Sequence, residues 1–162
     1  MIIYQPIGVI QSPFRDQEGM PIQSAGAQGT HGWIEINDDY TEGLRNLEGF
    51  SHIILLYHFH LSNGFDIELA PFLDNTKRGV FATRAPRRPN PIGLSIVKLV
   101  GIEGKFLKIE NLDVVDGTPL LDIKPYIPAF DAIADAKSGW VQGKEEQVRD
   151  IRADDRFSRE NG

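Results

Sequence analysis

The chain has 162 residues, a formal net charge of −6, 41% hydrophobic residues and 25% charged residues. This composition is typical of one folded globular domain and excludes an intrinsically disordered chain. The absence of cysteine excludes disulfides, thiolate catalysis and cysteine-ligated metal or iron–sulfur sites. No apolar run approaches the length of a membrane span and no signal-peptide pattern opens the sequence, so we expect a cytoplasmic protein.

Extended segments dominate the hydrophobic pattern along the chain. The predicted strands cover residues 4–12, 33–36, 50–61, 92–102, 106–112 and 121–126. A glycine-lysine turn at 104–105 makes the fourth and fifth of these the best hairpin. Because the strands follow one another without a β-α-β alternation, the sequence predicts an all-β-dominated fold, a small antiparallel β-barrel with short helices and long loops.

The remaining segments are predicted as loops, short helices and a tail. A loop rich in Gly, Gln and Pro covers 13–32, and Asp38 or Asp39 caps a short helix that ends near Leu47. Pro125 suits an edge position in the last strand. A second short helix is expected over 144–151, within a mostly polar tail in which Trp140 and Val141 are possible anchors.

The strand at 50–61 is apolar on both faces, which is typical of a strand buried on both sides, in a closed barrel or at a subunit contact. It therefore predicts a homodimer. His58 and His60 fall on one face of this predicted strand, and such a pair is half of a metal site that His31 or a carboxylate would complete. The alternative is that the two histidines are hydrogen-bonded residues at the end of a strand.

A segment rich in arginine and proline, residues 79–93, is the most unusual stretch of the chain. Its run at 80–83 is strand-like, and it then places Arg84, Arg87 and Arg88 among three prolines within six residues. Proline restricts its own backbone and that of the residue before it, so this loop loses less entropy on ordering than an ordinary loop. Guanidiniums held in this way suit an anion or a planar ring. The alternative is a stiff connector whose arginines face water.

Basic residues are concentrated in the same region. Between residues 75 and 102 there are six basic residues and no acidic one, whereas the rest of the chain holds 11 basic and 23 acidic residues. One basic segment on an acidic protein indicates a local anion site, in contrast to a surface that coats nucleic acid nonspecifically.

Several motifs follow one another in an order and spacing that resemble a known family. They are Val80-Phe81-Ala82-Thr83-Arg84, Arg88-Pro89-Asn90-Pro91-Ile92-Gly93, Asp116-Gly117-Thr118-Pro119, Asp122-Ile123-Lys124-Pro125-Tyr126, Ile7-Gly8-Val9-Ile10 with Ser12-Pro13, and Leu47-Glu48-Gly49-Phe50-Ser51-His52. Over residues 4–131 the chain resembles the TsaA-like family, also called TrmO. We expect this domain to occupy 1–138, followed by a charged tail over 139–162 where longer bacterial members carry an additional domain.

The resemblance implies a function as well as a fold. Members of this family are S-adenosylmethionine-dependent tRNA methyltransferases with a non-Rossmann β-barrel that act as homodimers. They methylate N6 of threonylcarbamoyladenosine, next to the anticodon of certain threonine tRNAs. The implied cofactor is S-adenosyl-L-methionine and the implied partner is a tRNA. Methyl transfer of this kind requires no metal.

The resemblance also implies site residues. It assigns parts of the cofactor pocket to Ser24, Ala25 and Gly26, to Gly117, Thr118, Pro119 and Leu120, and to His60 and Leu61. Arg84, Arg87 or Arg88 would bind the methionine carboxylate or tRNA phosphates. The acceptor nitrogen is a poor nucleophile, so a general base or a desolvated pocket would assist the transfer. The polar candidates are Asp116, Asp122, Lys124 and Tyr126.

Each of these candidates has a purely structural interpretation. Asp116 is a natural turn residue beside Gly117, Asp122 would pair with an arginine or Lys124, and Tyr126 would anchor a loop. Two other functions also remain open. One is a module that binds S-adenosylmethionine without turnover, motivated by the acidic net charge and the lack of the further domain. The other is a metal-dependent small-barrel enzyme built on His58 and His60.

Overall fold

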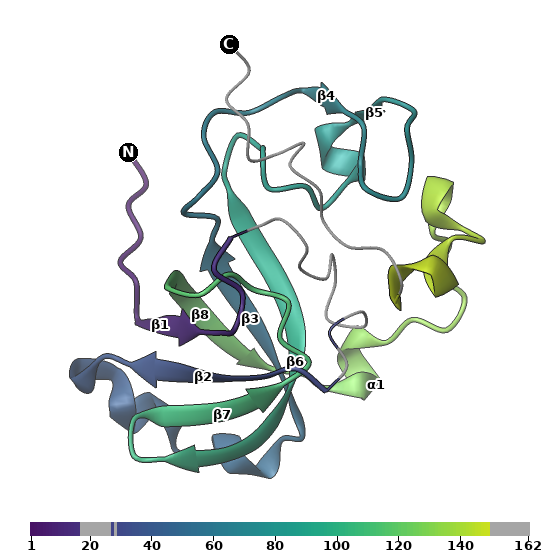
Figure 1. The fold of residues 1–162 in the computed structure, drawn as a ribbon. Helices are drawn as coiled ribbons and strands as arrows, with labels where there is room; N and C mark the ends of the chain where they lie inside the picture. The colour runs from purple at the N-terminus through teal and green to yellow at the C-terminus, as the bar shows by residue number, and fades with distance from the viewer. Residues whose placement is uncertain (17–26, 28, 150–162) are drawn as a thin grey trace.

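A closed barrel of six antiparallel strands forms the body of the protein (Figure 1), in the order β1-β2-β7-β6-β3-β8. The structure is a computed structural model and describes residues 1–16, 27 and 29–149. The barrel strands are β1 (Gly8–Gln11), β2 (His31–Ile36), β3 (His52–His58), β6 (Ile92–Glu103), β7 (Phe106–Glu110) and β8 (Thr118–Pro125). The antiparallel barrel expected from the sequence is confirmed.

Short elements lie outside the barrel. They are the 3-10 helices η2 (Asp38–Leu44), η3 (Leu47–Gly49), η4 (Val80–Ala82), η5 (Gly139–Val141) and η6 (Glu145–Arg149), the helix α1 (Pro128–Asp131), and the strand pair β4 (Glu68–Leu69) and β5 (Arg78–Gly79). In Figure 1, η2 and η3 lie below the barrel, and β4 and β5 lie above it. No helix among the described residues is both long and apolar enough to span a bilayer.

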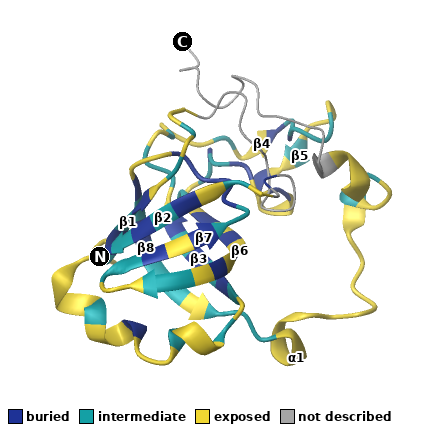
Figure 2. Ribbon diagram, turned by 60° about the horizontal axis from the view of Figure 1, so that its bottom comes forward, coloured by how far each residue is buried: buried dark blue, intermediate teal, exposed yellow. Residues whose placement is uncertain are grey.

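Alternation along the strands builds the core (Figure 2). On β3, the inward residues Ile53, Leu55 and Tyr57 are buried, whereas Ile54 and Leu56 on the outer face are only half-buried. The long strand β6 repeats this pattern, with every second residue from 93 to 99 buried and the intervening ones exposed. Within one copy of the chain, β3 is therefore buried on its inward face alone.

The ends of several predicted strands differ from the sequence-based expectation. The first strand begins only at Gly8, and β3 ends at His58, three residues earlier than predicted. The strand-like run at 80–83 is the 3-10 helix η4. The last strand begins at Thr118 and pairs with both β1 and β3, so it is not an edge strand. Pro125 is tolerated because it is the last residue of β8.

The predicted helix at 38–47 is also different. It is replaced by the two 3-10 helices η2 and η3, because Asn46 adopts a left-handed backbone with φ 68° between them. The N-cap residue of η2 is Asn37, and neither Asp38 nor Asp39, and the Asn37 side chain makes no capping hydrogen bond. Instead the Asp38 carboxylate pairs with the Lys105 ammonium at 3.2 Å.

Candidate functional site

A cavity of about 840 Å³ opens at the end of the barrel where β3 ends and β6 and β8 begin. Its walls come from the end of β3 and the turn that follows it, from residues 71–73, from the arginine- and proline-rich segment, from residues 113–118, and from residues 137–141. Cavities of this volume are typical of sites for small molecules and cofactors. Five segments of the described chain thus meet at one open end of the barrel.

A buried chain of hydrogen bonds leads to the cavity wall. The Ser95 hydroxyl donates to Asp113 Oδ1 at 2.6 Å, and Tyr57 Oη lies 2.9 Å from Ser95 Oγ. Because the single Ser95 proton goes to Asp113, Tyr57 donates to Ser95. Burial and the nearby Asp113 charge raise the pKa of Tyr57, so its hydroxyl stays protonated. Tyr57 and Asp113 both line the cavity, which places a carboxylate on a wall that is otherwise largely apolar.

The packing of Tyr57 depends on a glycine in the neighbouring strand. Gly93 is directly opposite Tyr57 in the register of β3 and β6. A Cβ atom at position 93 would lie 2.2 Å from Tyr57 Cε2 and 2.5 Å from Cζ. The glycine of the Asn-Pro-Ile-Gly motif therefore leaves the space in which the Tyr57 ring lies.

The two histidines near the end of β3 belong to different elements. The strand ends at His58, whose side chain is exposed, and the following turn brings His60 to the cavity. The predicted strand face shared by His58 and His60 does not form, because β3 ends at His58. His60 Nδ1 lies 3.4 Å from Thr118 Oγ1, and burial, with a smaller contribution from His58, lowers the pKa of His60. His60 is accordingly neutral at pH 7. Leu61 also lines the cavity.

The three arginines of the predicted anion site have different roles in the structure. Arg87 is buried, pairs with Asp66 at 2.8 Å and donates to the Asn63 carbonyl, so it holds the loop together. Arg88 lines the cavity and donates from Nη1 to the carbonyls of Thr83 and Ala85, at 2.9 and 3.2 Å. Arg84 is exposed at the cavity wall.

The four predicted catalytic residues belong to the described part of the chain, but none lines the cavity. Asp116 accepts a hydrogen bond from the Ser12 backbone at 2.9 Å in an exposed turn. Asp122 pairs with Lys124 at 2.9 Å on the outer face of β8. Tyr126 packs edge-on against His52, with ring centroids 6.4 Å apart.

The predicted cofactor residues are also distributed. Thr118 lines the cavity, Gly117 occupies the preceding turn with φ 79°, and Leu120 is fully buried in the core. Pro119 borders a smaller depression beside His58. Ser24, Ala25 and Gly26 lie outside the described residues.

A metal site built on histidine finds little support in the geometry. His31 lies on β2 and pairs with Glu110 at 3.7 Å. In the described ranges 1–16, 27 and 29–149, no three or more His, Cys, Asp or Glu residues are arranged to hold a metal ion.

The sequence analysis missed several residues of the cavity wall and of the hydrogen-bond chain behind it. Asp113 precedes the Asp-Gly-Thr-Pro motif by three residues, and Ser95 is a polar residue at an inward position of an alternating strand. A polar residue at a core position needs a partner, which is the signal that would have found Ser95. Phe59, Phe72 and Phe81 add aromatic walls, but their sequence positions carry no comparable signal.

Comparison with known proteins agrees with this geometry. The family model described as the tRNA-methyltransferase O N-terminal domain matches residues 9–132. A relative in Pyrococcus abyssi, named a probable S-adenosyl-L-methionine-binding protein, is 47% identical over 97% of this chain and 85% of its own length. The tRNA (adenine(37)-N6)-methyltransferase of Escherichia coli is 37% identical over 86% of this chain.

The structural comparison leads to the same family. A crystal structure of TrmO from Pseudomonas aeruginosa is 40% identical and has a TM-score of 0.73, over 86% of this chain and 62% of that one. The chain spans 63% of the Escherichia coli methyltransferase, less than two thirds of its length. The resemblance seen in the sequence is confirmed, and the chain belongs to the family of the tRNA-methyltransferase O N-terminal domain.

Proposed function

We propose that this protein is an S-adenosylmethionine-dependent tRNA methyltransferase that methylates N6 of threonylcarbamoyladenosine next to the anticodon. The names of the Pyrococcus abyssi and Escherichia coli relatives support the donor and the tRNA adenine, respectively. The observation that carries the proposal is the cavity at the open end of the barrel, which combines apolar walls with Asp113, Arg84 and Arg88.

The charges of the cavity walls complement those of the proposed donor. S-adenosylmethionine carries a sulfonium and an ammonium cation, a carboxylate and an adenine ring. Asp113 provides a negative charge for a cation, and the guanidinium of Arg88 suits the carboxylate, which leaves the exposed Arg84 for a tRNA phosphate. His60, being neutral, adds no positive charge beside the sulfonium. Phe59 and Phe72 offer apolar surface for the adenine.

Methyl transfer requires mainly that the protein position the methyl donor and the acceptor nitrogen. The N6 lone pair attacks the donor methyl carbon in line with the carbon–sulfur bond, which breaks with its electron pair going to sulfur and gives S-adenosylhomocysteine. The N6 proton must leave to a base or to water. Asp116, Asp122, Lys124 and Tyr126 remain predictions for the base, and in one copy of the chain they lie outside the cavity.

We also infer a homodimer, from an apolar stripe on the outer face of β6. Ile92, Leu94 and Ile96 are 42%, 44% and 39% exposed, and Ile92 and Leu94 also border the cavity. Leu94 of this stripe is paired with the half-buried Leu56 of β3, and Leu56 is paired in turn with Asp122 of β8, so the three residues lie in one row on the outer face of the barrel. A second copy docked on this stripe would cover apolar area beside the cavity and place polar groups of β8 nearby.

The dimer is tested by light scattering. Leu94→Glu puts a charge at the centre of the stripe and should convert a dimer into a monomer. Ile133→Glu is the matched control, because Ile133 is 74% exposed and is far from the stripe in the sequence. A wild-type monomer at working concentration contradicts the homodimer.

The methyltransferase proposal is tested by incubating the protein with S-adenosylmethionine and a threonine tRNA that carries threonylcarbamoyladenosine. Mass spectrometry of the nucleosides should show a new methylated threonylcarbamoyladenosine. Bound S-adenosylmethionine without any methylated nucleoside would favour the binding module. The proposal places this reaction in the cytoplasm, where a tRNA substrate is available.

A further inference from the structure

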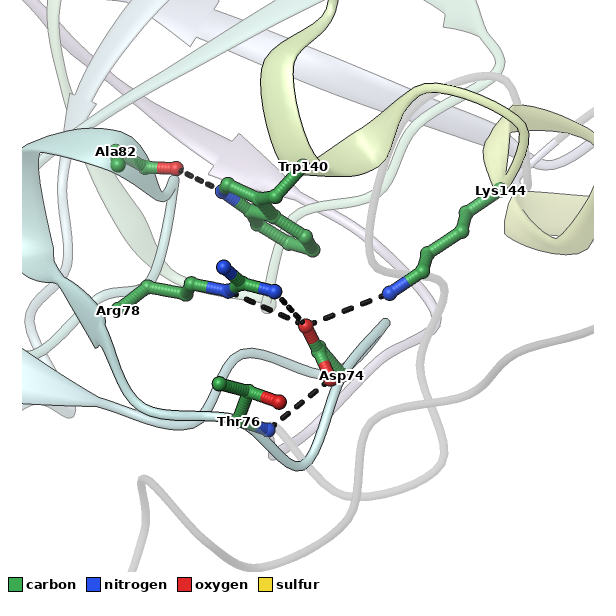
Figure 3. Close-up of polar contacts among 6 residues, drawn as sticks. All are labelled: Asp74, Thr76, Arg78, Ala82, Trp140 and Lys144. Carbon is green, nitrogen blue, oxygen red and sulfur yellow. Dashed lines mark hydrogen bonds and ion pairs between the residues drawn. The ribbon is translucent and has the colours of Figure 1, made fainter.

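The cavity has a wall that the barrel does not supply. Residues 137–141 pack across the arginine- and proline-rich segment, and Trp140 lines the cavity from there. Its indole Nε1 donates to the Ala82 carbonyl at 2.7 Å (Figure 3). The one polar atom of the side chain is therefore satisfied by protein, and the ring plane is fixed without a ligand.

An ion cluster holds the indole from a second direction. The Arg78 guanidinium carbon lies 5.5 Å from the Trp140 ring centroid and the Lys144 ammonium 5.6 Å from it. Both cations bind the same oxygen, Asp74 Oδ2, and the other carboxylate oxygen accepts from the Thr76 backbone at 3.0 Å (Figure 3). These contacts hold the pKa of Asp74 well below its usual range, so the cluster is ionised at neutral pH.

A second aromatic side chain of the cavity belongs to the residue before Ala82. Phe81 immediately precedes Ala82, lines the same cavity and is 79% exposed. Most of the Phe81 side chain faces solvent, so contacts within the protein do not explain why an aromatic residue lies at this position. Two aromatic side chains thus line the cavity near Ala82: Trp140, which donates to the Ala82 carbonyl, and Phe81, which precedes Ala82 in the chain.

The acidic and basic side chains that line the cavity lie on different walls. The Trp140 side has two cations against one carboxylate, which leaves one net positive charge, and Lys137 also lines that side. The barrel side carries Asp113 and the neutral His60, whereas Arg84 and Arg88 line the cavity from the arginine- and proline-rich segment, to which Trp140 is hydrogen-bonded through Ala82. A donor with a cationic sulfonium is favoured on the barrel side, whereas a polyanionic RNA is favoured on the Trp140 side.

We propose that Trp140 and Phe81 form the surface on which the acceptor adenine of the RNA stacks, opposite the methyl donor. The proposal rests on the proposed function and assigns a part of the cavity to each substrate. Bases stack on aromatic side chains whatever their sequence context, and a base must leave its own stack to reach a donor in a cavity. A ring already fixed by Ala82 and the ion cluster requires little ordering when the base arrives.

The first experiment uses Trp140 as its own reporter. The chain has two tryptophans, so Trp33→Phe leaves Trp140 as the single one. The probes are S-adenosylmethionine and a dye-labelled anticodon stem-loop RNA that carries threonylcarbamoyladenosine, with S-adenosylhomocysteine present during the RNA titration. The RNA should quench Trp140 emission, and S-adenosylmethionine alone should leave it unchanged. Equal quenching by S-adenosylmethionine alone would assign Trp140 to the donor and overturn the proposal.

The second experiment measures kinetics. Trp140→Ala should raise KM for the RNA about tenfold or more, because base stacking on an aromatic residue contributes that much, and should change the Kd of S-adenosylmethionine less than twofold. Phe81→Ala should have the same kind of effect, but a smaller one. Trp140→Phe keeps a ring and should recover most of the loss, which a merely structural role of the indole hydrogen bond would not allow.

The outcomes separate this proposal from the methyltransferase function. If the wild type methylates the RNA and Trp140→Ala leaves its KM unchanged, the stacking surface alone is overturned. The same holds if anisotropy of the dye shows RNA binding while Trp140 emission stays constant. If the wild type binds S-adenosylmethionine but no RNA, the proposed tRNA substrate fails, and the stacking surface fails with it.

Discussion

The inside of the barrel and the rim of its cavity are built on different physical principles. Inside, every strand is paired on both sides, and residues such as Ile53, Leu55 and Leu107 are fully buried. At the rim, short 3-10 helices and loops are joined by ion pairs, among them Arg87 with Asp66 and Arg78 with Asp74. Stability is therefore concentrated in the barrel, while charge and aromatic surface for ligands are concentrated at the rim.

Buried side chains of the barrel and ion pairs of the rim differ in how much they contribute to the free energy of unfolding. Deleting a buried aliphatic side chain leaves a cavity and costs several kcal/mol, on the order of 2–5. An ion pair that remains in contact with water contributes about 1 kcal/mol or less. Changes inside the barrel should therefore appear in unfolding experiments, and changes at the rim should appear in binding and kinetics.

The largest expected effect is a loss of stability in the barrel. Ile53→Ala removes a side chain that is 0% exposed and should lower the free energy of unfolding by about 2–5 kcal/mol. Urea unfolding followed by circular dichroism measures the change. Ile133→Ala, at a position that is 74% exposed, is the matched control and should cost under about 0.5 kcal/mol. Equal losses for both variants would contradict the conclusion that stability is concentrated in the barrel.

The next effect concerns the buried carboxylate at the junction of the two regions. Asp113→Asn keeps the size of the side chain but removes the negative charge proposed to face the donor. It should weaken S-adenosylmethionine binding about tenfold or more, because hydrogen bonds to charged groups contribute about 1.5–3 kcal/mol. Calorimetry measures this loss, with the exposed Asp39→Asn as control. Unchanged affinity in folded Asp113→Asn protein would remove Asp113 from the donor site.

A smaller effect is expected from the exposed arginine of the rim. Arg84→Ala should weaken binding of the anticodon stem-loop about fivefold and reduce the slope of log affinity against log salt by about one, because one phosphate contact is lost. Its unfolding midpoint should match that of the wild type. Arg45→Ala is the control, since Arg45 is exposed, directly follows η2 and does not line the cavity. A salt slope that is the same for both variants would show that Arg84 meets no phosphate.

The smallest effect is a response to acid at the ion cluster. A carboxyl whose folded pKa is depressed stabilises the fold above its unfolded pKa of about 4, and this contribution is lost as the pH falls through the folded value. Because the Arg78 and Lys144 contacts depress the pKa of Asp74, Trp140 emission in Trp33→Phe protein should stay constant from neutral pH to below pH ~4. Asp74→Asn should shift that emission at neutral pH. A change of Trp140 emission near pH ~6 in the Trp33→Phe protein, which retains Asp74, would show that a different group titrates there.

The sequence was a good guide to the barrel, because strand alternation is a local signal. The inward residues of β3 and β6 could be predicted from their period of two alone. The limits of the strands were less predictable: β8 begins earlier than expected because its pairing with β1, a contact across more than a hundred residues, extends it to Thr118. The 3-10 form of residues 80–82 is likewise set by the loop around it.

The cavity was only partly predictable. The motif at 79–93 indicated an anion site, and Arg84 and Arg88 do line the cavity, but only the structure shows that Arg87 is used to hold the loop. Trp140 was a possible anchor from the sequence, yet its partner Ala82 is 58 residues away. Contacts of this kind depend on tertiary packing, and no local pattern encodes them.

The most direct test of the account is a calorimetric titration of the purified wild-type protein, freed of carried-over ligand, with S-adenosylmethionine. We predict saturable micromolar binding, weakened by Asp113→Asn and unchanged by Trp140→Ala. Absence of any binding by protein that circular dichroism shows to be folded would contradict the assignment of the barrel-end cavity to the methyl donor.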